Sequence, residues 1–146
     1  MRKFYGKGKF NNKKVESPDG VFDSKLEWQR WLFLKEAEKN GQIRDLRRQV
    51  KYTLIPTQYR TEIVQLKTKK KEVQRVAERE ITYTADFTYY KPAKEPDIPA
   101  GEREYWGLVV EDAKGYPNDR WPLKKSMMLY FHGIAVREVK KATEPI

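Results

Sequence analysis

The sequence predicts an α/β fold in which helices flank a central mixed sheet. Residues 81–90 alternate apolar and polar side chains over ten positions, which is typical of a half-buried strand. Helix signals cover residues 24–40 and 119–131, one set before and one set after the predicted strands. The resulting order is a helix, about three strands, a helix and a last strand, which predicts a sheet covered by helices.

The composition indicates one folded domain. The chain has 146 residues, of which 36% are charged, and its 4 Trp, 9 Tyr and 6 Phe supply large apolar surfaces for a core. We therefore expect a flexible basic arm over residues 1–20, a single domain over 21–140 and a loose tail over 141–146.

The charge favours a polyanionic partner. A formal net charge of +10 and a pI of about 9.6 suit nucleic acid first and an anionic membrane second, although plain solubility also produces basic chains. No apolar run reaches membrane length, and no secretory segment follows the basic start. We expect a soluble, cytoplasmic protein without membrane contact or a small-molecule cofactor.

The scarcity of cysteine and histidine excludes several kinds of site. With no cysteine there is no disulfide, thiol nucleophile or cysteine-based metal centre. The single histidine, His132, leaves no histidine-cluster metal site, and its position before Gly133 favours a role at a helix end.

The first helix, residues 24–40, carries a carboxylate beside its apolar face. Asp23 or Ser24 can cap the helix, and Glu27 follows near its start. Glu27 has two interpretations, because Ser24 to Glu27 also fits the S-x-x-E capping box. The two roles are hard to combine if both carboxylate oxygens are committed to capping.

A basic stretch precedes the first strands. Arg44, Arg47 and Arg48 lead into a strand over residues 49–55, and a second strand is expected over 61–67. The charged segment 67–80 fits either a short surface helix or a long hairpin.

Two later strands carry acids in unusual places. Asp86 is the one charged residue of the strand 81–90, where the alternative is a hydrogen bond to a neighbouring threonine. In the strand 105–114, Asp112 and Lys114 share one face, and Glu111 faces the other way. That end is either a solvated exit from the core or a metal-ion phosphodiesterase site.

The second helix, residues 119–131, places Lys124 and Lys125 near the end of that strand. Its core-facing residues are expected to be Leu123, Met127 and either Tyr130 or Phe131. A last strand should follow over residues 134–139.

The acids and their order resemble the PD-(D/E)XK nuclease superfamily. The stretches 22–27, 41–46, 83–87 and 110–115 are similar, more closely, to a small phage and prophage family of nuclease-like proteins, over roughly residues 20–140. The resemblance implies a restriction-endonuclease-like core with the order α-β-β-β-α-β. One departure is Ala85, where the motif name has proline.

The resemblance also implies roles for four residues. Asp86 and Asp112 would be metal ligands, and Glu27 a direct or water-mediated ligand. Lys114 would orient or activate the attacking water. The expected metal is Mg²⁺, with Mn²⁺ able to substitute, because Mg²⁺ prefers oxygen ligands.

The expected activity is that of a phage-type DNA endonuclease in replication or recombination, acting on branched DNA such as Holliday junctions or flaps. A homodimer would place one active site on each strand, in the host cell cytoplasm if the chain is phage-encoded. The alternatives are a non-catalytic basic nucleic-acid-binding protein and a subunit of a phage DNA-processing complex. The expected DNA contacts are Arg44, Arg47, Arg48, Lys124 and Lys125.

Overall fold

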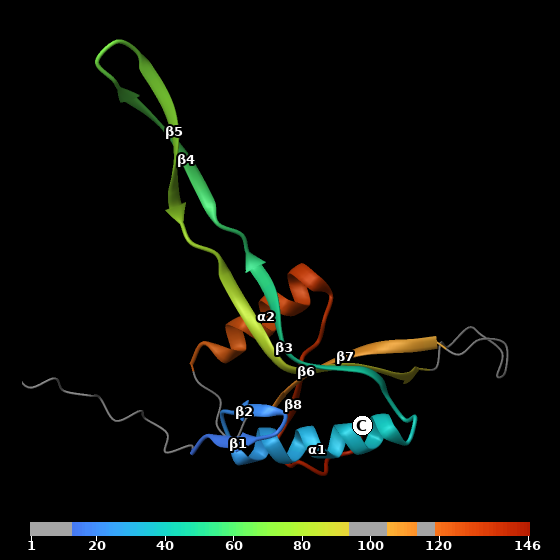
Figure 1. The fold of residues 1–146 in the computed structure, drawn as a ribbon. Coiled ribbons are helices and arrows are strands. Elements are labelled where there is room, and N and C mark those ends of the chain that lie inside the picture. Colours follow the sequence, from blue (N-terminus) through green and yellow to red (C-terminus); the bar gives the residue numbers. More distant parts are fainter. Residues whose placement is uncertain (1–12, 94–104, 114–118) are drawn as a thin grey trace, which may run out of the picture.

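A four-stranded mixed sheet lies at the centre of the computed structural model, which describes residues 13–93, 105–113 and 119–146 (Figure 1). Neighbouring strands are antiparallel except the last two, which run parallel. The strands, in spatial order, are β3 (Arg44–Ile55), β6 (Ile81–Ala93), β7 (Tyr105–Ala113) and β8 (Arg137–Val139). The predicted class, an α/β fold with a mixed sheet, is confirmed at this level.

Two helices pack on this sheet, α1 (Lys25–Lys39) and α2 (Trp121–His132), close to the predicted ranges. Ser24 caps α1, because its hydroxyl oxygen accepts a hydrogen bond from the Glu27 backbone N–H at 3.1 Å. Gly133 ends α2 with a φ of 66°, a left-handed conformation that glycine adopts without strain. Neither helix within the described residues combines the length and the apolar character needed to cross a lipid bilayer.

The rotation of α2 differs from the prediction. Of the predicted core-facing residues, Met127 packs against the core beside the buried Met128 and Trp121, whereas Leu123, Tyr130 and Phe131 are 60%, 83% and 51% exposed. The pattern of apolar residues was ambiguous because this helix is apolar on more than one face, and packing against the sheet selects the face that carries Met128.

The strand β6 contributes to two separate hydrophobic clusters. The alternation predicts that Ile81, Tyr83, Ala85, Phe87 and Tyr89 share one apolar face, and four of these five are buried, whereas Ile81 is 40% exposed because it lies where the strand leaves the body. Tyr83 and Ala85 pack with α2, and Phe87 and Tyr89 pack with α1. The change occurs about Asp86, where the neighbouring strand has Gln49 at a φ of 54°. Strong local twist of a long strand pair explains how one strand can serve both helices.

Two hairpins lie outside the central sheet. β1 (Val15–Ser17) and β2 (Gly20–Phe22) form a small one, so that residues 15–20 of the predicted N-terminal arm are strands and turn, and residues 1–12 lie outside the described part. β4 (Gln58–Gln65) and β5 (Lys70–Glu78) form a long one that extends away from the rest of the molecule (Figure 1). Of the two interpretations of the charged segment 67–80, the long hairpin is confirmed.

The C-terminal residues, where the sequence predicts a loose tail, are attached to the body. The Arg30 guanidinium donates to the backbone carbonyls of Ala142 at 3.0 Å and Glu144 at 2.5 Å. Ile146 packs against the cluster between α1 and the sheet, and Figure 1 shows the C-terminus beside α1. Burial of Arg30 supplies the reason, because its N–H groups need acceptors inside the fold.

Candidate functional site

A pocket of about 340 Å³ opens where β6, β7 and the start of α2 meet. Two carboxylates and two cationic side chains contribute to it, together with hydroxyl groups and aromatic rings. The lining residues are Thr82, Tyr83, Thr84, Asp86, Asp112, Arg120, Trp121 and Lys124.

Strand register brings the two acids of this pocket together. Phe87 is paired with Glu111 across the antiparallel strands β6 and β7. The next position along each strand holds Asp86 and Asp112, and residues at facing positions of an antiparallel pair are close neighbours. The pairing of β6 with β7 therefore places Asp86 and Asp112 at facing positions of the sheet.

Backbone and side-chain donors fix both carboxylates. Asp86 Oδ2 accepts a hydrogen bond from the Ala113 N–H at 2.8 Å, and its Oδ1 lies 3.5 Å from the Gln49 amide nitrogen. Asp112 is buried, and its Oδ2 accepts from the Tyr83 hydroxyl at 2.9 Å. Burial, with the nearby Asp112 charge, raises the pKa of the Tyr83 hydroxyl, so Tyr83 keeps its proton and remains a donor at neutral pH.

Glu27 is buried beside this pocket and is absent from its lining. Its Oε2 accepts from the Asp23 backbone N–H at 3.0 Å, and its Oε1 accepts from the Gln49 amide at 3.1 Å. Burial raises the pKa of the Glu27 carboxyl. Both oxygens are thus engaged. One accepts from the residue before the N-cap Ser24, where a strict capping box would use the Ser24 N–H itself, and the other holds the Gln49 side chain.

Gln49 links Glu27 to Asp86, although no motif in the sequence points to it. Its amide nitrogen lies within 3.1 Å of one carboxylate and 3.5 Å of the other. The position depends on a left-handed backbone conformation in the middle of β3, which alternation along a strand does not predict. Arg120 was also missed, although its spacing of four residues from Lys124 at a helix start was a usable signal.

The five predicted DNA contacts lie in different environments in the structure. Lys124 lines the pocket, whereas the Arg48 guanidinium donates to the carbonyls of Asp19 and Val21 at 2.7 and 2.6 Å and lies 3.8 Å from the centre of the Phe22 ring. Arg48 therefore attaches the β1–β2 hairpin to β3, a structural role.

The other three predicted contacts lie away from the pocket lining and have partners within the chain. Lys125 forms an ion pair with Glu138 at 3.2 Å, and Arg47 forms one with Asp45 at 3.0 Å. Arg44 lies over the Trp106 ring at 4.2 Å from its centre. Lys114, the predicted catalytic lysine, lies outside the described residues and directly follows Ala113 in the sequence.

Two of the side chains that line the pocket are carboxylates, a type of ligand that Mg²⁺ accepts. No group of three or more His, Cys, Asp or Glu side chains that could hold a metal exists among residues 13–93, 105–113 and 119–146. Mg²⁺, however, is usually held by one or two carboxylates and keeps several water molecules. Asp86 and Asp112 provide two such carboxylates on one pocket wall, whereas a tight site built entirely from protein ligands is not present in the described residues.

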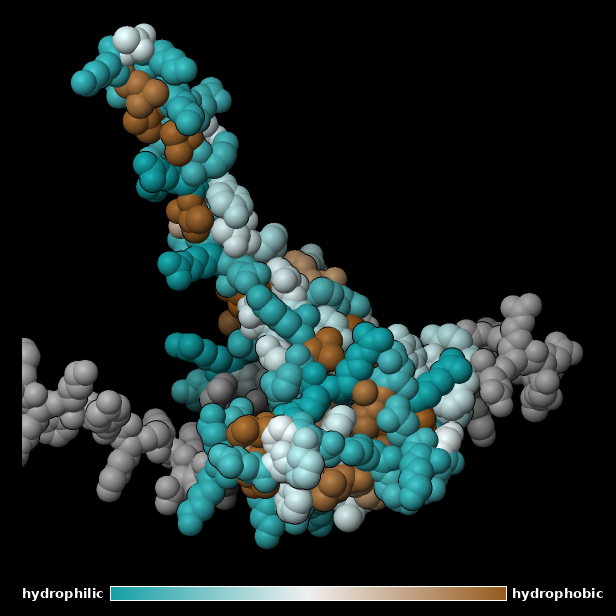
Figure 2. Space-filling model, in the orientation of Figure 1, coloured by the Kyte–Doolittle hydropathy of each residue, from teal (hydrophilic) through white to brown (hydrophobic). Residues whose placement is uncertain are grey.

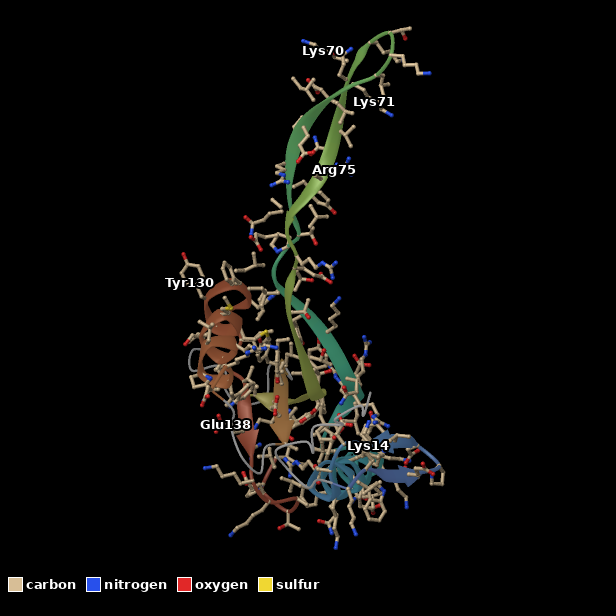
Figure 3. All side chains as sticks on the ribbon, turned by 90° about the vertical axis from the view of Figure 1, so that its left-hand side faces the viewer. Lys14, Lys70, Lys71, Arg75, Tyr130 and Glu138 are labelled. Carbon is tan, nitrogen blue, oxygen red and sulfur yellow. The ribbon has the colours of Figure 1, made fainter. Side chains whose placement is uncertain are left out.

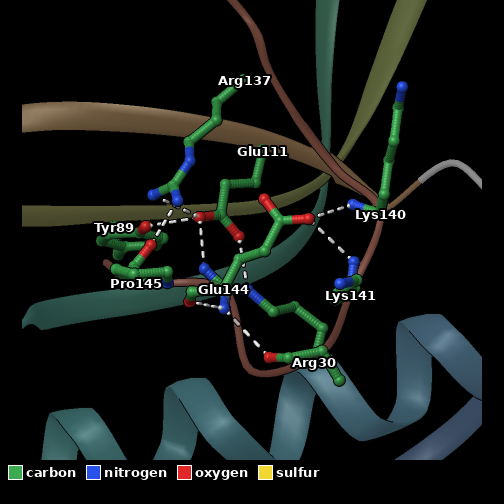
Figure 4. Close-up of polar contacts among 9 residues, drawn as sticks. Arg30, Tyr89, Glu111, Arg137, Lys140, Lys141, Glu144 and Pro145 are labelled. Atoms are coloured by element: carbon green, nitrogen blue, oxygen red, sulfur yellow. Dashed lines mark hydrogen bonds and ion pairs between the residues drawn. The ribbon is translucent and has the colours of Figure 1, made fainter.

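Glu111, the acid on the opposite face of β7, has a structural role (Figure 4). It accepts two hydrogen bonds from the buried Arg30 guanidinium at 2.9 and 2.7 Å and one from the Tyr89 hydroxyl at 2.6 Å. Arg137 lies 3.4 Å from the same carboxylate. The network joins α1, β6, β7 and β8, so Glu111 stabilises the fold on the face opposite to Asp112.

Comparison with known proteins gives a family. Residues 7–142 match a family described as "Protein of unknown function (DUF1064)". No curated protein and no solved structure matches the chain. Because the match spans nearly the whole sequence, the chain belongs to the DUF1064 family.

Proposed function

We propose that this protein is a Mg²⁺-dependent DNA endonuclease that hydrolyses phosphodiester bonds at the pocket between β6, β7 and α2. One observation carries the proposal: Asp86 and Asp112, from neighbouring strands, line a single pocket together with the cationic Lys124. An acidic pair inside a chain of net charge +10 suits a site where a metal ion and a polyanion bind together.

The order of elements supports membership of the PD-(D/E)XK superfamily. If the two outlying hairpins are set aside, the chain runs α1, β3, β6, β7, α2, β8, which agrees with the α-β-β-β-α-β order of a restriction-endonuclease-like core. Asp86 and Asp112 fall on the second and third of these strands, as the acids of the nuclease motifs do in that resemblance.

The residues of the pocket would divide the work of hydrolysis. Asp86 and Asp112 would hold Mg²⁺, which, when bound, offsets charge on the phosphoryl oxygens and lowers the pKa of a bound water. Ala113 and Tyr83 keep the two carboxylates in place by donating hydrogen bonds to them. A water would form a bond to phosphorus and lose a proton to solvent, the bond from phosphorus to the leaving oxygen would break, and that oxygen would take a proton from solvent.

Two lysines would act on the attacking water and on the phosphate. Lys114 would orient the attacking water, and Lys124 would bind the phosphate. Glu27 would act through Gln49, keeping the Asp86 side chain in its orientation, and its absence from the pocket lining makes this role fit better than that of a direct ligand.

The proposal also includes the substrate, which would be branched DNA, and the oligomeric state, which would be a homodimer. Leu129, Tyr130 and Phe131 are exposed on α2, and such an apolar surface supports contact with a second copy. A homodimer would present two active sites to a Holliday junction or flap in phage replication or recombination, in the cytoplasm of the host.

The test is cleavage of labelled DNA by wild type, Asp86→Asn and Asp112→Asn. Asparagine keeps an oxygen that can accept from Ala113 or Tyr83, so the fold should survive while the charge that holds Mg²⁺ is lost. We expect cleavage to fall more than about 100-fold with DNA binding retained. Asp45→Asn, which removes an exposed carboxylate from β3, is the matched control and should cut as wild type does.

The substrates are a four-way junction, a flap, a plain duplex and a single strand, each with Mg²⁺ and with EDTA. The nuclease proposal is supported if wild type and the control cut DNA in the presence of Mg²⁺ and the two site variants do not. The substrate that is cut fastest then indicates which DNA structure the enzyme processes. Binding without cutting by all four proteins would instead favour a non-catalytic nucleic-acid-binding protein or a subunit of a larger complex.

A further inference from the structure

The β4–β5 hairpin forms an arm that pairs only within itself among the described strands. Gln58 to Gln65 are in register with Lys70 to Glu78, and this two-stranded sheet is separate from the central four-stranded one. Figures 1 and 3 show from two sides that the arm leaves the body and extends beyond it. Its nine-residue strand β5 spans roughly 30 Å, because a strand rises about 3.3 Å per residue.

The far end of the arm is strongly basic. Lys67, Lys69, Lys70 and Lys71 stand within five positions without an acid between them, and all four are exposed. Figure 3 shows Lys70 and Lys71 at the end remote from the body. Ion pairs on the arm involve Arg60, Arg75 and Glu62, and within the described residues none engages these four lysines.

One face of the arm exposes three large apolar side chains among polar ones. Tyr59 and Ile63 share a face by strand alternation, and Val76 joins them because it is paired with Tyr59. These side chains are 63%, 68% and 51% exposed, and Figure 2 shows hydrophobic side chains among hydrophilic ones along the arm. An isolated two-stranded hairpin is marginally stable in water, so three exposed apolar side chains on one, among polar neighbours, indicate that a partner covers this face.

We propose that this arm is a DNA-binding ribbon that lies along the major groove of the duplex whose phosphodiester occupies the pocket. The major groove admits a two-stranded β-ribbon, and the four tip lysines match the charge of the phosphate backbone. A second copy of the chain, with the same basic tip, is a poorer match in charge. The inference rests on the proposed nuclease function and adds a second contact region to it.

The base of the arm adjoins the pocket. Thr82 and Thr84 line the pocket, and they follow the arm directly in β6. A duplex that enters the pocket can therefore continue along the arm. Since one turn of B-DNA advances about 34 Å over about 10 base pairs, the tip lysines would contact phosphates roughly one turn from the bond that is cut.

The absence of cysteine makes this geometry measurable. Thr68→Cys puts a unique thiol at the arm tip, and Glu36→Cys puts a matched one on the exposed side of α1. Each thiol carries an iron–EDTA group that cuts nearby DNA. We expect strand cuts about one helical turn from the enzyme's own cleavage position with the label at residue 68, and none with the label at residue 36.

Salt dependence provides a second readout. In EDTA, where no hydrolysis occurs, the double variant Lys70→Gln/Lys71→Gln should reduce the slope of log K against log salt concentration for a 30-base-pair duplex by about 2. The control Lys25→Gln/Lys39→Gln removes the same charge from α1 and should leave the slope unchanged.

The outcomes separate the two proposals. If wild type cuts DNA but the tip variant keeps the wild-type slope and the label at residue 68 cuts no DNA, the arm inference is overturned and the nuclease stands. A wild type that binds no DNA in any form overturns both. Loss of a dimer rather than of DNA contacts in the tip variant would identify a second copy as the occupant and also overturn the inference.

Discussion

At the scale of single residues, the buried ion pair between Arg30 and Glu111 is the interaction whose loss should destabilise the fold most. Both side chains are fully buried, and Tyr89, Ala142 and Glu144 complete the hydrogen bonding around them. Satisfying every polar atom makes such a network tolerable inside a core, and removing one member leaves a buried charge without its partner.

We expect Arg30→Met and Glu111→Leu each to lower the free energy of unfolding by about 3–5 kcal/mol, because each leaves an uncompensated charge. The double variant should cost clearly less than the sum of the two. Urea unfolding of the four proteins measures this coupling. Arg47→Met breaks an exposed pair of similar geometry and should cost less than about 1 kcal/mol. Additive losses would show that the pair does not act as a unit.

Glu27 predicts a pH dependence of stability. Burial raises its pKa in the folded protein above the value of 4.5 in the unfolded chain, so the folded state binds the proton more tightly. Its stabilising contribution is complete below the unfolded pKa and is lost as the pH rises through the folded pKa. Wild type should therefore gain stability relative to Glu27→Gln as the pH falls from 7, and the difference should level off below about 4.5.

Urea unfolding of both proteins over this pH range, at constant ionic strength, measures the difference. Other acids are common to the two proteins and cancel. A difference that stays constant with pH, or that moves toward the variant on acidification, would contradict a raised pKa at Glu27.

At the scale of elements, the two hairpins differ in how they are held. The β1–β2 hairpin is attached by the Arg48 guanidinium, which binds two of its carbonyls and stacks on Phe22. The β4–β5 arm continues the strands β3 and β6 outward and pairs within itself. The first hairpin is part of the body, whereas the arm can contribute little to the stability of the body.

Removal of the arm tests this independence. Ile55 and Ile81 are paired across β3 and β6, so replacing residues 56–80 by Asn-Gly should close a tight hairpin at that point. We expect cooperative unfolding with a free energy within about 1 kcal/mol of wild type, because shortening a connection changes closure entropy little. Circular dichroism in urea is the measurement. Loss of cooperative unfolding would show that the arm supports the core.

At the scale of the whole molecule, the distribution of charge and the shape both fit the proposed binding of DNA. The pocket with Asp86 and Asp112 adjoins the base of the arm, and the lysines of the arm occupy its far end. A chain of net charge +10 that gathers acids in one pocket and lysines on an extended arm separates the region proposed for chemistry from the region proposed for backbone contact.

Local patterns were sufficient for much of this structure. Caps and apolar spacing located α1 and α2, and the alternation of residues 81–90 located β6 with its buried side chains. Alternation along β7 also separated Asp112 from Glu111 correctly, because neighbouring side chains of a strand must point to opposite faces.

Other features depended on contacts between distant parts of the chain. The partners of Glu111, the attachment of the tail by Arg30 and the structural use of Arg48 join residues between 22 and 114 positions apart. The face that α2 buries and the left-handed turn at Gln49 follow from packing and sheet twist. The sequence by itself determined the elements and the chemical character of the acids, since these depend on near neighbours, whereas tertiary structure decided which charges stabilise the fold and which line the pocket.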